Sequence, residues 1–165
     1  LFGTVPNCVA MATQGARSIA IDPSREAITR ARVAASNSEV VVEFHEGDLA
    51  DLGFLMNAVI DLAVCVHQIN FDTDIARLFR QVHRVLRPEA GLVFAVTHPM
   101  SAVFDNNDPT ARRQYGSTTP TIGELTMALQ RANFSIDVMH ELTPLHQPRA
   151  VAPSTLVVRA RKLGS

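Results

Sequence analysis

The chain has 165 residues, 47% hydrophobic and 19% charged, which is enough to bury one substantial core, so we expect a single domain over residues 1–165. Its formal net charge of -1 excludes the broad positive field that attracts nucleic acid or an anionic membrane, and favours a small, neutral or weakly charged partner. No apolar stretch approaches the roughly 18 residues that span a bilayer, and no leader pattern opens the chain, so we expect a cytoplasmic protein.

The first third of the sequence alternates between helical and strand patterns. The opening "FGTVPNCVAMATQG" combines a glycine turn with an alanine-rich helix, and Gly15 is placed to take the left-handed conformation that closes the helix. The run "RSIAIDP" is typical of a short buried strand that ends at Asp22. Ser24 predicts the N-cap of a helix that extends to about Ser36.

The middle of the chain continues this alternation. "EVVVEFHEGDL" and "AVIDLAVCVHQI" predict two more strands, and residues 51–57 between them leave room for a turn of helix. An apolar stripe at helical spacing follows, and Pro88 ends it before the strand "GLVFAVTHP"; the stripe consists of Ile75, Leu78, Phe79, Val82, Val85 and Leu86. The order predicts an α/β fold with a Rossmann-like, mostly parallel sheet and helices on both faces.

The last third begins with a long irregular segment. Residues 99–120 are rich in Asp, Asn, Thr and Pro, and a stretch of this length is usually a lid, a mobile binding loop or disordered. Thr121 and Glu124 then form a capping-box pattern, and Asn133 can close that helix in a left-handed conformation. Because no helix pattern separates "FSIDVMHE" from "STLVVRARK", these two strands should form a C-terminal antiparallel pair.

Two acidic residues follow predicted strands. Ligands of open parallel sheets sit at the carboxyl ends of strands, and Asp22 follows Gly3 at roughly the 20-residue spacing at which an acid binds ribose hydroxyls. The alternative is that Asp22 only caps the helix after it. Asp48, after Gly47, could accept a hydrogen bond from the exocyclic amine of a base, although taken alone it is more often a turn residue.

Two histidines also end predicted strands. His67 ends "DLAVCVHQ" and His98 ends "LVFAVTHP", which puts both imidazoles at one edge of the sheet. A single histidine in such a place is more often a hydrogen-bonded structural residue than a proton acceptor, so both interpretations stay open. The other histidines show no metal-ligand spacing and predict no metal site; they are His45, His83, His140 and His146.

Five segments in order carry a family resemblance: "GARSIAIDPSREAITRAR", "VVVEFHEGDLADL", "IDLAVCVHQI", "LFRQVHRVLRPEAGLVFAVTHP" and "ALQRANF". Together they resemble class I S-adenosylmethionine-dependent methyltransferases, in particular the bacterial small-molecule branch. The resemblance extends from Gly3 to Ala160. It implies S-adenosylmethionine as cofactor and a small-molecule methyl acceptor as partner, and it leaves a homodimer open.

The resemblance also implies roles for particular residues. Gly3 belongs to the glycine loop beside the methionine part of the cofactor, and Asp22 binds the ribose. Asp48 and Leu49 contact the adenine, whereas Val66 and His67 flank the transferred methyl group. If the acceptor is a hydroxyl or an acid, His98 or His67 takes its proton.

Two departures from the family pattern leave other functions open. Val5 stands where a second glycine is usual, and the strand that precedes this loop in the family has no counterpart before Leu1, so we expect either a fragment of a longer chain or a shortened, decayed relative. "RPEAG" also has one glycine where the family usually has two adjacent ones. One alternative is an inactive methyltransferase-fold remnant that acts as a binding module, and a less favoured one is a nicotinamide-dependent oxidoreductase.

Overall fold

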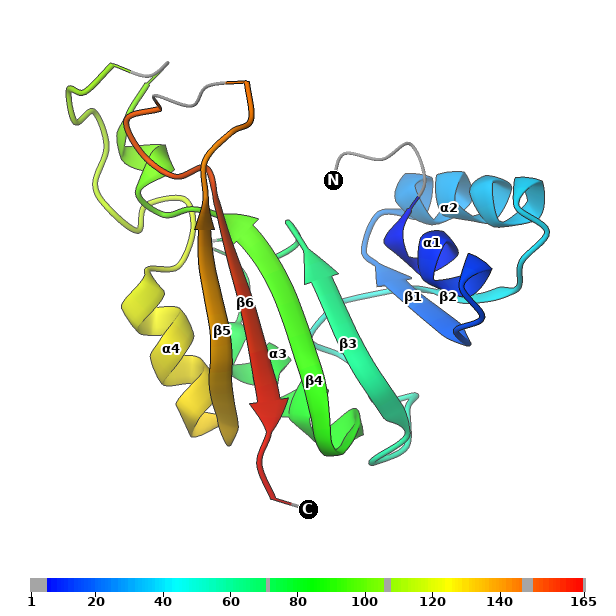
Figure 1. The fold of residues 1–165 in the computed structure, drawn as a ribbon. Coiled ribbons are helices and arrows are strands. Elements are labelled where there is room, and N and C mark those ends of the chain that lie inside the picture. Colours follow the sequence, from blue (N-terminus) through cyan, green and yellow to red (C-terminus); the bar gives the residue numbers. More distant parts are fainter. Residues whose placement is uncertain (1–5, 71, 106–107, 147–149, 165) are drawn as a thin grey trace. The chain divides into compact units, whose positions relative to one another are not determined.

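The computed structural model describes residues 6–70, 72–105, 108–146 and 150–164 (Figure 1). Its contacts divide the chain into two compact units, Leu1–Asp51 and Leu52–Ser165, and each unit has its own sheet. The expectation of a single domain over residues 1–165 therefore remains a prediction. No helix of the described residues is both long enough and apolar enough to cross a membrane.

The first unit is a small parallel α/β layer. It contains α1 (Asn7–Thr13), β1 (Ser18–Asp22), α2 (Arg25–Asn37) and β2 (Val42–Glu46). β1 and β2 pair in parallel, as a strand, crossover helix and strand should. Gly15, with φ +90°, follows α1 and takes the predicted left-handed conformation.

Helix α2 begins where the sequence predicts. The Ser24 hydroxyl accepts a hydrogen bond from the backbone N–H of Ala27, which satisfies a donor that has no partner within the helix. Three apolar side chains at helical spacing, Ile28, Ala31 and Ala35, are buried. The contacts of α2 with β1 and β2 place it on their small sheet.

The second unit is a four-stranded mixed sheet in the order β3-β4-β6-β5. Its elements are β3 (Ile60–Val66), α3 (Ile75–Val85), β4 (Leu86–Thr97), the short 3-10 helix η1 (Ser101–Val103), α4 (Ile122–Arg131), β5 (Phe134–Leu142) and β6 (Thr155–Lys162). β3 runs parallel to β4, and β6 runs antiparallel to both β4 and β5. The predicted α/β sheet with a C-terminal antiparallel pair is confirmed.

One face of this sheet forms the core of the second unit. In β4 and β6 the buried apolar side chains alternate along the central part of the strands and include Leu92, Phe94, Val96, Leu156, Val158 and Ala160. α3 packs against β4, α4 packs against β5, and the two helices contact each other (Figure 1). Phe79 on α3 meets Phe94 with ring centroids 5.5 Å apart. On β3, Leu62 and Val64 remain 49% and 36% exposed, so the buried face is concentrated on the other strands.

The ends of α3 and α4 have different partners. The capping box predicted at Thr121 and Glu124 is present, and Asn133 follows α4 with φ +62°. At the end of α3, the buried ammonium of Lys162 donates to the carbonyl oxygen of Leu86 over 2.9 Å. A cation suits the partial negative charge at a helix C-terminus, and this hydrogen bond joins β6 to the junction of α3 and β4.

Residues 51–57 form turns, and the expected turn of helix is absent from this fully described stretch. Arg84 on α3 holds the segment in place with three hydrogen bonds. Its guanidinium donates to the carbonyl oxygens of Leu52 and Leu55 over 2.7 and 2.8 Å, and to Oδ1 of Asn57 over 2.9 Å. The carbonyl oxygen of Leu52 also accepts from the N–H of Leu55 over 2.9 Å, so the segment makes a single local turn that the Arg84 side chain holds against α3.

The described part of residues 99–120 is attached to the second unit. η1 contains Val103, which is only 6% exposed, and Phe104 and Ala111 form an isolated antiparallel bridge. Pro99 and Thr119 are also buried. The segment thus has fixed points near both ends, and a lid function for it remains a prediction.

We expect Arg84→Ala to lower the free energy of unfolding by about 1.5–3 kcal/mol, because two backbone carbonyls and Asn57 lose a charged donor. Urea unfolding of the whole chain measures this loss. Arg87→Ala is the matched control, since Arg87 is an exposed neighbour whose ion-pair partner among the described residues is the exposed Asp61, and the change should alter stability by less than about 1 kcal/mol. Equal losses in the two variants would contradict the role given to Arg84.

We also expect Glu89→Gly to stabilise the chain by up to about 1 kcal/mol. Glu89 has φ +63°, a left-handed conformation that costs roughly 1–2 kcal/mol for a residue with a Cβ, and glycine adds back about 0.5–1 kcal/mol of chain entropy. The ion pair to Arg161 is long, at 3.9 Å, and contributes little. A lower melting temperature for Glu89→Gly would show that the turn does not carry this strain.

Candidate functional site

The first unit brings Asp22 and Asp48 to one edge. β1 and β2 are in parallel register, with Asp22 opposite Glu46, so their carboxyl ends lie side by side. The backbone N–H of Gly47 donates to the carbonyl oxygen of Asp22 over 3.2 Å, which ties the turn after β2 to the end of β1. The two candidate acids predicted from separate segments are therefore neighbours in the fold.

Asp22 is half-buried and uses one carboxylate oxygen locally. Its Oδ1 accepts a hydrogen bond from the backbone N–H of Ser24 over 2.8 Å, while Ser24 itself is the N-cap of α2. Part of the alternative interpretation is thus correct, because Asp22 does shape the turn into the helix. Its Oδ2 has no hydrogen-bond partner among the residues that the structure describes, and it can accept from a ligand hydroxyl.

Asp48 shapes the turn that follows β2. Its Oδ1 accepts from the backbone N–H of Ala50 over 2.9 Å, and its carbonyl oxygen accepts from the N–H of Asp51 over 3.0 Å. The Asp48 side chain is exposed, Leu49 is half-buried and Ala50 is buried. The turn therefore presents a polar and an apolar side chain in succession beside Asp22.

In the second unit, His67 stands at the carboxyl end of β3. Val66 pairs with Ala95, and the backbone N–H of His67 donates to the carbonyl oxygen of Ala95 over 2.7 Å. His67 is exposed and has φ +55°. A left-handed conformation is uncommon for a residue with a side chain, and such residues concentrate at functional sites.

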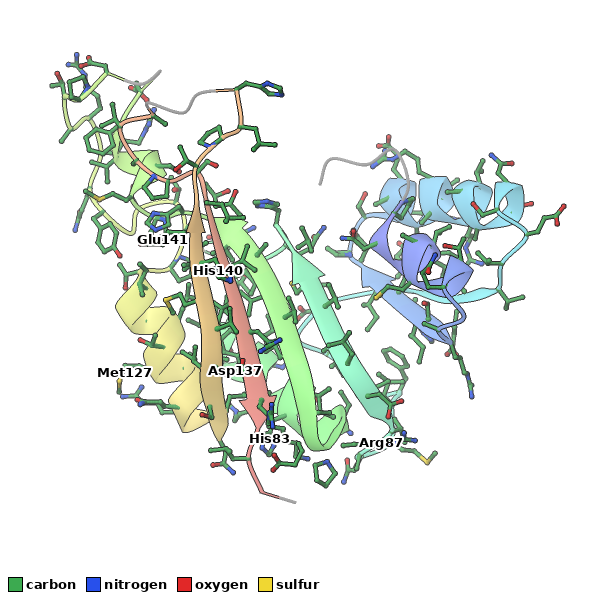
Figure 2. The ribbon with its side chains drawn as sticks, viewed as in Figure 1. His83, Arg87, Met127, Asp137, His140 and Glu141 are labelled. Atoms are coloured by element: carbon green, nitrogen blue, oxygen red, sulfur yellow. The ribbon has the colours of Figure 1, made fainter. Side chains whose placement is uncertain are left out.

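His98 is in a different environment, although its backbone reaches the same edge of the sheet. Its side chain is 4% exposed, and Nε2 lies 2.8 Å from Oε1 of Glu141, near the carboxyl end of β5 (Figure 2). Its Nδ1 accepts from the backbone N–H of Met100 over 3.1 Å. One predicted histidine is thus exposed at this edge, and the other is buried with both ring nitrogens engaged.

Cys65 precedes this edge on β3, and desolvation by burial raises its pKa to about 11. The thiol therefore stays protonated at neutral pH and does not supply a thiolate nucleophile. Burial also raises the pKa of Cys8 in the first unit. Neither cysteine is in a disulfide, and both are at least partly buried.

Sequence reasoning found most of the residues at these edges but missed Glu141. It has no local pattern that connects it with His98, and only the register of β6 between β4 and β5 brings their ends together, since Leu156 pairs with both Val96 and Glu141. Gly3 and Val5, in the opening loop, lie outside the described residues.

A scan against family models matches residues 2–94 to the family described as "Methyltransferase domain". No curated protein matches the chain with significance. Solved structures with this fold include an S-adenosylmethionine-dependent methyltransferase from Mesorhizobium loti, which is 24% identical with a TM-score of 0.72, where the match covers 88% of this chain and 80% of that one. A second, from Methanosarcina mazei, is 22% identical with a TM-score of 0.71, and the match covers 95% and 87% of the two chains.

The [4+2]-cyclase SpnF has the same fold at 19% identity, with a TM-score of 0.70 and coverage of 95% of this chain and 70% of that one. These solved structures are similar in fold, whereas the family model matches the sequence itself over more than half of its length. The parallel strand pairs and the C-terminal antiparallel strands agree with that match. The chain belongs to the class I S-adenosylmethionine-dependent methyltransferase family.

Proposed function

We propose that this chain transfers a methyl group from S-adenosylmethionine to a small-molecule acceptor. The observation that carries the proposal is Asp22, whose Oδ2 has no partner among the described residues and which lies beside the turn at Gly47 and Asp48. An ionised carboxylate only accepts hydrogen bonds, and ribose hydroxyls donate them. The residues present therefore fit the adenosine part of the cofactor.

The proposed roles follow the edges of the two units. In the first unit, Asp22 binds the ribose, and Asp48 and Leu49 contact the adenine. In the second unit, Val66 and His67 flank the methyl group that is transferred. A role for Gly3 beside the methionine part is proposed from the family pattern alone.

Methyl transfer requires mainly that the protein align the acceptor atom with the methyl group. S-adenosylmethionine supplies a methyl group on a sulfonium that is already activated for in-line displacement. The protein's contribution is to hold the two reactants in line, which can account for several kcal/mol of rate enhancement. Where the acceptor is a hydroxyl or an acid, the exposed His67 is the better placed of the two histidines to receive its proton, because the His98 ring is buried.

The alternative function is a methyltransferase-fold domain that binds a ligand or partner without methyl transfer. The fold similarity to the [4+2]-cyclase SpnF supports keeping this alternative, because that protein has the same fold and is a cyclase by name. Family membership favours S-adenosylmethionine over a nicotinamide cofactor. A cytoplasmic location, a homodimer, and the absence of nucleic-acid and membrane partners remain predictions.

We expect Asp22→Asn to weaken binding of S-adenosylhomocysteine by roughly 10- to 150-fold, the equivalent of losing about 1.5–3 kcal/mol from a charged acceptor. Isothermal titration calorimetry of the whole chain measures this, with NAD as the control ligand. Asparagine keeps an oxygen for the N–H of Ser24, so the turn should survive. Glu26→Gln, an exposed change in the first turn of α2, is the matched control and should bind like the parent.

If the parent binds S-adenosylhomocysteine and Asp22→Asn binds it equally well, the ribose assignment is wrong. If the parent binds neither S-adenosylhomocysteine nor NAD, the result favours the non-enzymatic alternative. Tighter binding of NAD than of S-adenosylhomocysteine would overturn the proposed cofactor.

A further inference from the structure

We propose that His98, together with Glu141, is a positioning residue that fixes the start of the segment after β4, and that it does not take the proton of the methyl acceptor. The inference rests on the proposed function in one respect only, namely that the carboxyl edge of β3 and β4 is where the acceptor binds. The hydrogen bonds by which His98 holds this segment, which we call the anchor, lie entirely within the second unit.

The hydrogen bonds of the ring determine its tautomer. A backbone N–H can only donate, so Nδ1 of His98 must carry the lone pair that accepts from Met100 at 3.1 Å. The proton of the neutral ring is therefore on Nε2, which donates to the Glu141 carboxylate at 2.8 Å. The one lone pair of the neutral imidazole is already in use, and the side chain is 4% exposed. A base needs an available lone pair within reach of its substrate, and His98 has none.

The backbone of His98 adds three more bonds. Its N–H donates to the carbonyl oxygen of Ser154 over 2.9 Å, just before β6. Its carbonyl oxygen accepts from the N–H of Ser101 over 2.9 Å and from the Ser101 hydroxyl over 2.8 Å, at the start of η1. Through side chain and backbone, this residue joins the end of β4 to β5, to the entry of β6 and to η1.

Residues 111–113 are held in place by hydrogen bonds to η1 and the residues beside it. The carbonyl oxygen of Val103 accepts from the N–H groups of Arg112 and Arg113 over 2.8 and 3.2 Å, and the carbonyl oxygen of Ala102 accepts from the Arg113 guanidinium over 3.2 Å. Arg113 also pairs with Asp105 at 2.6 Å. Residues 111–113 are thus bonded to residues 102–105, whose position is set by His98.

This arrangement places the anchor beside the edge where a ligand is expected. His67 bonds through its N–H to Ala95, three residues before His98, so the exposed histidine and the anchored segment begin at the same end of β4. Ligands of open parallel sheets sit at such carboxyl ends. His98 therefore acts on the acceptor through the residues that it holds, including the 40% exposed Met100.

Two kinds of measurement on the whole chain test the proposal. Imidazole ¹⁵N NMR at neutral to alkaline pH should show the Nε2–H tautomer for His98, with a hydrogen-bonded Nδ1, and no other role requires this pair of signals. Hydrogen exchange followed by mass spectrometry should show exchange of residues 99–105 and 111–113 faster by about tenfold in His98→Ala, because their anchor is lost.

The conservative variants separate the contributions of the hydrogen bonds made by the two ring nitrogens. His98→Asn keeps a short acceptor for the Met100 N–H and should restore most of the protection, whereas His98→Gln extends toward Glu141 and should restore less. Glu141→Gln keeps an acceptor oxygen and should stay close to the parent, whereas Glu141→Ala should resemble His98→Asn, because both keep the bond to the Met100 N–H and lose the one between residues 98 and 141. His140→Asn, an exposed neighbour on β5, is the control and should change nothing.

The proposal is overturned if NMR shows the Nδ1–H tautomer, or if His98→Ala leaves exchange of these residues unchanged. If His98→Ala fails to fold, the NMR tautomer of the parent and the exchange rates of His98→Asn, His98→Gln and the Glu141 variants still test the proposal. S-adenosylhomocysteine affinity should differ by less than about twofold between the parent and His98→Asn, because the hydrogen bonds of His98 are all within the second unit, whereas the residues assigned to the adenosine belong to the first. Failure of the parent to bind this probe would count against the proposed function and leave the anchor intact.

Discussion

The structure of both units depends on parallel strand pairing. Parallel strands must be joined by a crossover, and their carboxyl ends then lie at the same edge of the sheet. β1 and β2 obey this rule in the first unit and bring Asp22 beside Gly47, while β3 and β4 do so in the second and bring His67 beside Ala95. At each edge, residues that are far apart in the sequence become neighbours in the fold.

The second unit uses polar side chains to connect elements that the sheet alone does not join. Arg84 bonds the turns before β3 to α3, Lys162 bonds the end of α3 to β6, and His98 bonds β4 to β5. Each of these side chains donates to a backbone carbonyl or a carboxylate on another element. Because leaving a buried polar group unpaired costs more than a typical hydrogen bond gains, such pairs specify one arrangement of neighbouring elements.

Family and fold constrain the chemistry without choosing the acceptor. The edges of the two sheets present acids in one unit and an exposed histidine in the other, and the same fold in SpnF belongs to a [4+2]-cyclase. What distinguishes one reaction from another on a shared fold is the set of loops and side chains at the site, and the segment that follows β4 is one such loop. In this chain that segment begins at His98, and its first residues are held by bonds to β5 and to the entry of β6.

The sequence by itself determined the elements whose causes are local. The Ser24 cap, the capping box that begins at Thr121 and the left-handed Asn133 involve residues at most four positions apart, so pattern alone predicted them. The α/β order and the antiparallel C-terminal pair also followed from the spacing of helix and strand patterns. Only the tertiary structure decided that His98 is buried against Glu141, because a contact across 43 positions depends on the register of three strands. Neither residue carries a local signal of that register, and burial is a property of the assembled sheet.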